Sequence, residues 1–172
     1  FCVDPTRIYA SGYSGGGRML SQYICNGHPD FAAAGFVMGL RAGYPVERDG
    51  VWQPDVASCN PGNPISIIAF SGMKDVTNPF IGGGRPYWQY GGEAALRRWA
   101  ELDKCEAKGD VLTDASMTAL SFDTCASGAR IFSSVERVIN GVSPNTTSTS
   151  SAPRAISSFA ASTACAVPIR SS

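Results

Sequence analysis

The sequence has a single histidine, His28, among its 172 residues, and this scarcity limits the chemistry that can be expected. A structural zinc site needs several paired ligands, and the six cysteines have no CxxC spacing, so we expect no metal and no other cofactor. Net charge is absent too, because 14 Lys and Arg residues balance 14 Asp and Glu residues. A neutral chain has no overall field to attract nucleic acid or an acidic membrane, so we predict neither as a partner.

Long apolar runs are also missing, since none reaches the roughly 18 residues that span a bilayer. The longest, residues 31–40, is short enough to be a buried strand, and its near-continuous apolar character predicts a strand at residues 31–39 that is buried on both faces of a parallel sheet. With 44% hydrophobic and 16% charged residues, the chain can bury the core of one domain. We therefore expect a soluble, monomeric protein.

The cysteines are dispersed along the chain, which is typical of disulfide bonds formed in an oxidising compartment. Six cysteines allow fifteen pairings, and the sequence does not choose among them. The pairs that we favour are Cys25–Cys59 and Cys105–Cys125. The sequence begins without Met at what looks like the edge of a strand, so we expect a fragment that lacks upstream residues and any secretion signal. A glycosylation sequon at Asn145 agrees with a secreted, extracellular protein.

Short β-prone segments alternate with amphipathic helical ones, which predicts an α/β fold with a mostly parallel sheet. Residues 44–63 and 71–84 are rich in Pro, Gly and polar residues and read as loops. After Gly141, Ser, Thr, Ala and Pro dominate, so we expect a domain over residues 1–142 and a disordered tail over residues 143–172. We predict helices at residues 15–26 and 93–104, and strands at residues 7–10, 31–39, 64–70, 111–113, 117–122 and 131–139.

One motif carries chemistry, the G-x-S-x-G sequence of residues 12–16, which follows a predicted strand and opens a predicted helix. This arrangement holds a serine, here Ser14, on a strained turn with its hydroxyl exposed, while the flanking glycines let strand and helix pass closely. The backbone N–H of Gly15 can then supply one donor of an oxyanion hole. The alternative is a glycine-rich turn without chemical meaning.

The run CVDPTRIYASGYSGGG of residues 2–17 resembles the same region of fungal feruloyl esterases and of related polyhydroxybutyrate-depolymerase-like esterases. The resemblance continues through residues 67–75, 78–83 and 98–105, and covers about residues 1–139. It implies a serine esterase with a partial α/β-hydrolase fold from which N-terminal strands, and with them the second oxyanion donor, are missing. Ser14 would be the nucleophile.

The resemblance also implies that Asp75 is the acid of a catalytic triad. Its place just after a buried strand is where α/β sheets put functional groups, and the order Ser then Asp fits. An aspartate that only caps a loop turn is the alternative. The sequence departs from the family at Ser71, where relatives usually have His.

A serine hydroxyl needs a base, and no histidine follows Asp75. In the family a histidine follows the strand that corresponds to residues 131–139, but here the resemblance ends at that point. His28 lies beyond the helix that Ser14 opens, roughly 15–20 Å from the hydroxyl by helix length. We expect it to be a surface residue and the chain to be nearly inert as written, through a shifted reading frame, an aberrant exon or a true loss of the base.

The resemblance implies a carboxylic ester hydrolase that releases ferulic or related hydroxycinnamic acids from plant cell-wall polysaccharide, xylan or pectin, through an acyl-enzyme. Small esters would also be substrates. An acetylxylan esterase or a polyester depolymerase uses the same chemistry, and a non-catalytic polysaccharide-binding or structural relative is the alternative of another class. Aromatic side chains in predicted loops are candidates for stacking on a ferulate ring or a sugar, although such residues more often cover the core: Trp52, Tyr87, Trp88 and Tyr90.

Overall fold

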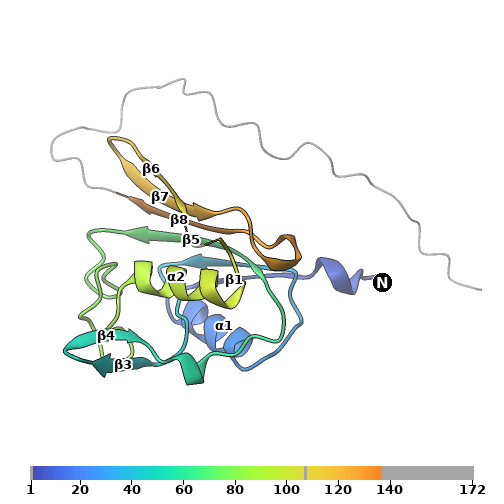
Figure 1. Ribbon diagram of the computed structural model, residues 1–172, viewed down its shortest axis with the longest axis horizontal. Coiled ribbons are helices and arrows are strands. Elements are labelled where there is room, and N and C mark those ends of the chain that lie inside the picture. Colours follow the sequence, from blue (N-terminus) through green and yellow to red (C-terminus); the bar gives the residue numbers. More distant parts are fainter. Residues whose placement is uncertain (1, 107, 137–172) are drawn as a thin grey trace, which may run out of the picture. The chain divides into compact units, whose positions relative to one another are not determined.

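The computed structural model describes residues 2–106 and 108–136, of which those from Asp4 onward form one compact unit (Figure 1). Its centre is a six-stranded, mostly parallel sheet with helices packed on it, so the prediction of an α/β fold is confirmed. The tail predicted over residues 143–172, the domain boundary at residue 142 and the sequon at Asn145 lie outside the described residues. No helix in the described part of the chain is long and apolar enough to cross a membrane.

Two α-helices, eight strands and three short 3₁₀ turns make up the described unit. The α-helices are α1 (Gly15–Cys25) and α2 (Gly92–Leu102), and the 3₁₀ turns are Pro5–Arg7, Val56–Ser58 and Ala126–Gly128. The strands are β1 (Tyr9–Tyr13), β2 (Ala33–Val37), β3 (Pro45–Arg48), β4 (Val51–Pro54), β5 (Ser66–Gly72), β6 (Asp110–Thr113), β7 (Met117–Phe122) and β8 (Ile131–Glu136).

The strand order of the sheet is β1-β2-β5-β8-β7-β6. The first four strands are parallel, and β7 and β6 continue the sheet as an antiparallel hairpin. In this register Tyr13 pairs with Val37 and Val37 with Phe70, so β1, β2 and β5 end side by side. The loops that follow these three strands therefore start at the same edge of the sheet.

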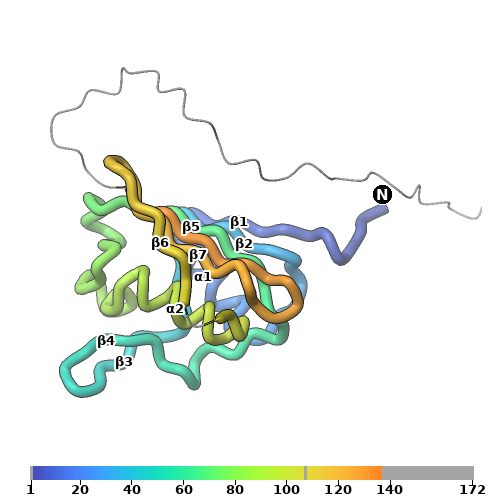
Figure 2. The backbone as a smooth tube through the Cα atoms, turned by 45° about the horizontal axis from the view of Figure 1, so that its top comes forward, coloured from blue at the N-terminus to red at the C-terminus, as the bar shows by residue number. Residues whose placement is uncertain are grey.

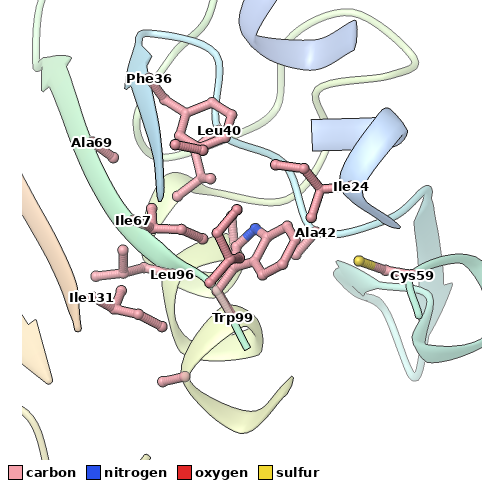
Figure 3. Packing of buried hydrophobic residues seen from close by; sticks show 14 of the residues in the cluster. Ile24, Phe36, Leu40, Ala42, Cys59, Ile67, Ala69, Leu96, Trp99 and Ile131 are labelled. Atoms are coloured by element: carbon pink, nitrogen blue, oxygen red, sulfur yellow. The ribbon is translucent and has the colours of Figure 1, made fainter. Parts of the chain in front are cut away.

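One face of the sheet carries the core. Alternate strand residues such as Phe36, Ile67 and Ile131 are buried against Ile24 of α1 and Trp99 of α2 (Figure 3). Both helices lie on this face in Figure 1. Burial of these side chains is the main term that stabilises the unit, at roughly 1.5–3 kcal/mol for each large apolar side chain.

The opposite face of the sheet is different over β2 and β5, because the alternate residues of these strands stay partly exposed there. Val37, Ile68 and Phe70 are about two-fifths exposed in the described unit. We predicted from its continuous apolar run that the strand at residues 31–39 would be buried on both faces. That prediction is wrong, since β2 is buried on its helix-facing side only.

Two element predictions need correction. The first strand begins at Tyr9 rather than Arg7, because Asp4 accepts the backbone N–H of Thr6 and holds Pro5–Arg7 in a 3₁₀ turn. The predicted loop over residues 44–63 contains the hairpin β3–β4, which lies apart from the main sheet on the helix side (Figure 2). A positive φ at Asp49 and Gly50 makes this hairpin turn, and we did not recognise the Asp-Gly pair as a turn signal.

Both favoured disulfides are present, so Cys25–Cys59 and Cys105–Cys125 are confirmed. The first ties the end of α1 to the loop before β5, and the second ties the end of α2 to the segment between β7 and β8. Such bonds fit a protein of an oxidising compartment.

Removal of the first disulfide should cost about 4 kcal/mol in the free energy of unfolding, because it closes a loop of 34 residues. The double variant Cys25→Ala with Cys59→Ala, compared with the oxidised chain in urea, measures this loss. An unchanged urea midpoint would contradict the prediction.

Candidate active site

Ser14 is the residue that joins β1 to α1, and its backbone has φ 48° and ψ −115°. A positive φ is rare for a residue with a side chain and marks strain, which structures retain mostly at functional positions. The N–H of Ser14 donates to the carbonyl of Val37 at 2.9 Å, which fixes the turn to the end of β2. The strained strand-to-helix turn that the motif predicts, here called the elbow (residues 12–16), is therefore formed.

Glycines make this turn possible through close backbone contacts. A Cβ on Gly12 would lie 2.6 Å from the Cα of Gly17, and one on Gly39 would lie 2.7 Å from the carbonyl oxygen of Ser14. We expected the two glycines of the motif to allow the close passage, but Gly16 has open space around it. The close approach depends instead on Gly12, Gly17 and Gly39, and Gly39 comes from the loop after β2.

A serine that begins a helix usually caps it by accepting a backbone N–H, and Ser14 makes no such capping bond. Its Oγ instead accepts a hydrogen bond from Nδ2 of Asn78, at 3.3 Å. The first N–H groups of a helix have no acceptor within the helix, and Gly15 lies at that position on the exposed start of α1. The hydroxyl and a helix N-terminus thus lie together, as an oxyanion site requires.

Asp75 lies in the loop after β5, at the edge of the sheet where Ser14 also lies. Its Oδ1 accepts the backbone N–H groups of Thr77 and Asn78, each at 2.8 Å. Asp75 therefore caps the turn of its loop, as the alternative role for this residue predicts. Both bonds use the same oxygen, and one of them positions the asparagine that contacts Ser14.

The neighbouring strand β8 ends beside β5, and the N–H of Met73 donates to the carbonyl of Glu136 at 3.2 Å. β8 and β5 therefore end at the same edge of the sheet, and the histidine that the family resemblance implies would follow this strand. In this sequence residues 137–140 are Arg-Val-Ile-Asn. Their structure lies outside the described residues.

His28, the only histidine in the sequence, is exposed and lies beyond the far end of α1 from Ser14. Its ring stacks on that of Tyr23 with centroids 4.1 Å apart. Helix α1 has 11 residues and is about 16 Å long, whereas a general base must lie within about 3 Å of the hydroxyl. His28 is a surface residue, as the sequence indicates.

The aromatic candidates differ in position. Tyr87 is 43% exposed, and its ring lies 4.2 Å from the guanidinium of Arg18, one turn after Ser14. Trp52 is 39% exposed, but it lies in β4 rather than in a loop, and no contact joins it to Ser14. Of the exposed candidates among the described residues, Tyr87 is therefore the one placed beside the elbow, through its contact with Arg18.

Trp88 belongs to the interior, with 3% of its surface exposed. Its Nε1 donates to the carbonyl of Pro79, and the guanidinium of Arg41 lies 4.2 Å from its ring. Tyr90 is equally buried and also contacts Arg41. The placement of Trp88 and Tyr90 contradicts our suggestion that they are available for stacking on a ligand.

Comparison of the sequence with known proteins identifies a distant relative. At 27% identity over 136 residues, the chain is similar to feruloyl esterase B of Piromyces equi. The chain is distantly related to a feruloyl esterase. The matched region is 76% of this chain and 24% of that protein, so the chain spans about a quarter of the length of the curated relative. No protein-family model matches the chain.

Proposed function

We propose that this chain carries the nucleophile of a secreted carboxylic ester hydrolase of the feruloyl esterase type. The strained backbone of Ser14, whose hydroxyl is not used as a helix cap, is the observation that supports it most. Asp75 would be the acid of the triad and the N–H of Gly15 an oxyanion donor. The distant similarity to a feruloyl esterase supports hydroxycinnamate esters of cell-wall polysaccharide as substrates, with acetylxylan or polyester as the alternatives.

In this reaction Oγ of Ser14 attacks the ester carbonyl carbon, and a base accepts the hydroxyl proton. The bond to the alcohol then breaks, the alcohol leaves with that proton, and water releases the acid from Ser14. The exposed ring of Tyr87 would contact an aromatic acyl group. The 172 residues contain no histidine that can serve as the base, so the chain alone should acylate slowly.

We expect added imidazole to substitute for the absent base. Acylation of Ser14 by p-nitrophenyl acetate, followed by mass spectrometry of the peptide, should become at least about 10-fold faster with imidazole, since a positioned base contributes a factor of 10²–10⁴. Ser14→Ala is the control, and it also corrects for the reaction of imidazole with the ester. If no label forms on Ser14 with or without imidazole, the proposal is wrong.

A non-catalytic, polysaccharide-binding role is the second candidate, and the distance of His28 from Ser14 favours it. Feruloylated arabinoxylan in affinity electrophoresis distinguishes the two roles. The binding role would be supported if the polysaccharide slows the migration of the parent chain and of Ser14→Ala equally, and if Ser14 is not acylated in the preceding experiment.

A further inference from the structure

Asn78 is the side chain that contacts the hydroxyl of Ser14, although the two residues are 64 positions apart in the sequence. It is 4% exposed, which is unusual for an asparagine. Sequence reasoning gave it no role beyond its place in a resembling segment. Buried polar groups are hydrogen-bonded in native proteins, so each partner of this amide is informative.

Its orientation is fixed by its other partners. Nδ2 donates to the carbonyl oxygen of Met38 at 2.9 Å, and Oδ1 accepts from Nη1 of Arg18 at 3.3 Å. The reversed amide would place two oxygens together at Met38 and two nitrogens together at Arg18. The atom that faces Oγ of Ser14 is therefore the nitrogen, and Ser14 is the acceptor.

The backbone of Asn78 has a separate partner, because its N–H donates to Oδ1 of Asp75. One residue thus contacts the nucleophile, the acid, helix α1 through Arg18 and the end of β2 through Met38. Met38 itself has a positive φ of 54°. A residue held from four sides is well suited to keep the Ser14 hydroxyl in one position.

We propose that Asn78 is a positioning residue for acylation of Ser14, an inference that rests on the esterase function proposed above. An N–H that donates to Oγ leaves the hydroxyl proton directed elsewhere, toward an incoming base. As the base removes that proton and the bond from Oγ to the carbonyl carbon forms, the same N–H stabilises the negative charge on Oγ. The ester then loses its alcohol as before, so Asn78 neither gains nor loses a proton.

Asn78→Leu keeps the branched shape and the four heavy atoms of the side chain and removes its donor. With p-nitrophenyl acetate and imidazole, acylation of Ser14 should become roughly 10- to 100-fold slower, the range expected for one hydrogen bond to a charged atom. The acylation rate of the variant should also begin to rise at a higher pH than that of the parent chain. The reason is that the alkoxide form of Ser14 has lost the hydrogen bond donated by Asn78. A merely structural role would not move this pH profile.

Ser21→Ala is the matched control, since Ser21 is buried in α1 and accepts the N–H of Arg41 without contacting Ser14. It should lose stability without this change in rate or pH profile. If Asn78→Leu does not fold, Asn78→Ser replaces it, because one hydroxyl cannot donate to Met38 and Ser14 together. If the folded variant has the acylation rate and the pH profile of the parent chain, this inference is wrong while the proposed function stands. If Ser14 is not acylated in the parent chain, both the proposed function and this inference are wrong.

Discussion

Gly12→Ala should lower the free energy of unfolding by about 3–5 kcal/mol, whereas Gly16→Ala in the same motif should raise it by up to about 1 kcal/mol. A Cβ on Gly12 would lie 2.6 Å from both Cα and N of Gly17 and 2.7 Å from the carbonyl carbon of Gly16. These are backbone atoms, so no change of rotamer can relieve the contact. The strand and the helix would have to move apart.

Gly16 provides the matched comparison because nothing lies within 4 Å of the place where its Cβ would be. It is exposed in the first turn of α1, where alanine restricts the unfolded chain more than glycine does. Urea denaturation of both variants measures the difference, and acylation of Ser14 reports on the elbow itself. Equal stabilities would show that the close passage of β1 and α1 is not what requires Gly12.

The elbow was predictable from the sequence because its determinants are local. Strand, glycines, serine and helix are contiguous over residues 9–25, and the structure forms them in that order. The strain at Ser14 is a property of the same few residues. The contribution of Gly39 was not predictable, because it depends on how the loop after β2 returns to α1.

Asn78 shows the limit of local reasoning. Its partners Ser14, Arg18 and Met38 lie 40 to 64 positions away, and only the parallel order of β1, β2 and β5 brings them together. The sequence predicted the strands but not which strand ends become neighbours. An asparagine three residues after the predicted acid, in the same predicted loop, was the available signal.

The aromatic residues show a related limit, because a loop assignment does not decide between exposure and core coverage. The loop of Trp88 and Tyr90 folds inward around Arg41, so these two residues cover the core. The hydroxyl of Tyr90 donates to the carbonyl of Gly43, and the indole of Trp99 donates to the carbonyl of Arg41. These bonds join the segment between β2 and β3 to the loop of Tyr90 and to α2, and composition alone does not reveal them.

Stability of this unit should fall as pH rises from about 5 to 8, and Asp103 is the expected cause. Its side chain is 0% exposed at the end of α2, and its two oxygens share the N–H of Ile65 at 3.3 Å each. Burial raises the pKa of this carboxyl to about 7, an effect that the Ile65 hydrogen bond only partly offsets. The negative end of the helix dipole also disfavours a carboxylate at that position.

A carboxyl with a raised pKa in the folded state binds its proton more tightly there than in the unfolded chain. The contribution of Asp103 to the free energy of unfolding is complete below the pKa of the unfolded chain, 3.8. It is lost as pH rises through about 7, where the folded carboxyl ionises. The full difference corresponds to about 4 kcal/mol in the free energy of unfolding. Asp103→Asn stays neutral, so its urea midpoint should change less between pH 5 and pH 8 than that of the parent chain.

The matched control is Asp123→Asn, which removes an exposed carboxylate of the same type. It should leave the pH dependence of the parent chain in place. Because the other carboxylates are common to all three chains, only the difference between the Asp103 and Asp123 variants reports on burial. Two results would contradict this prediction: a parent chain that is as stable at pH 8 as at pH 5, or an Asp103→Asn variant that keeps the full pH dependence. Either would mean that Asp103 is ionised in the folded state over this range, with a compensating partner near the end of α2.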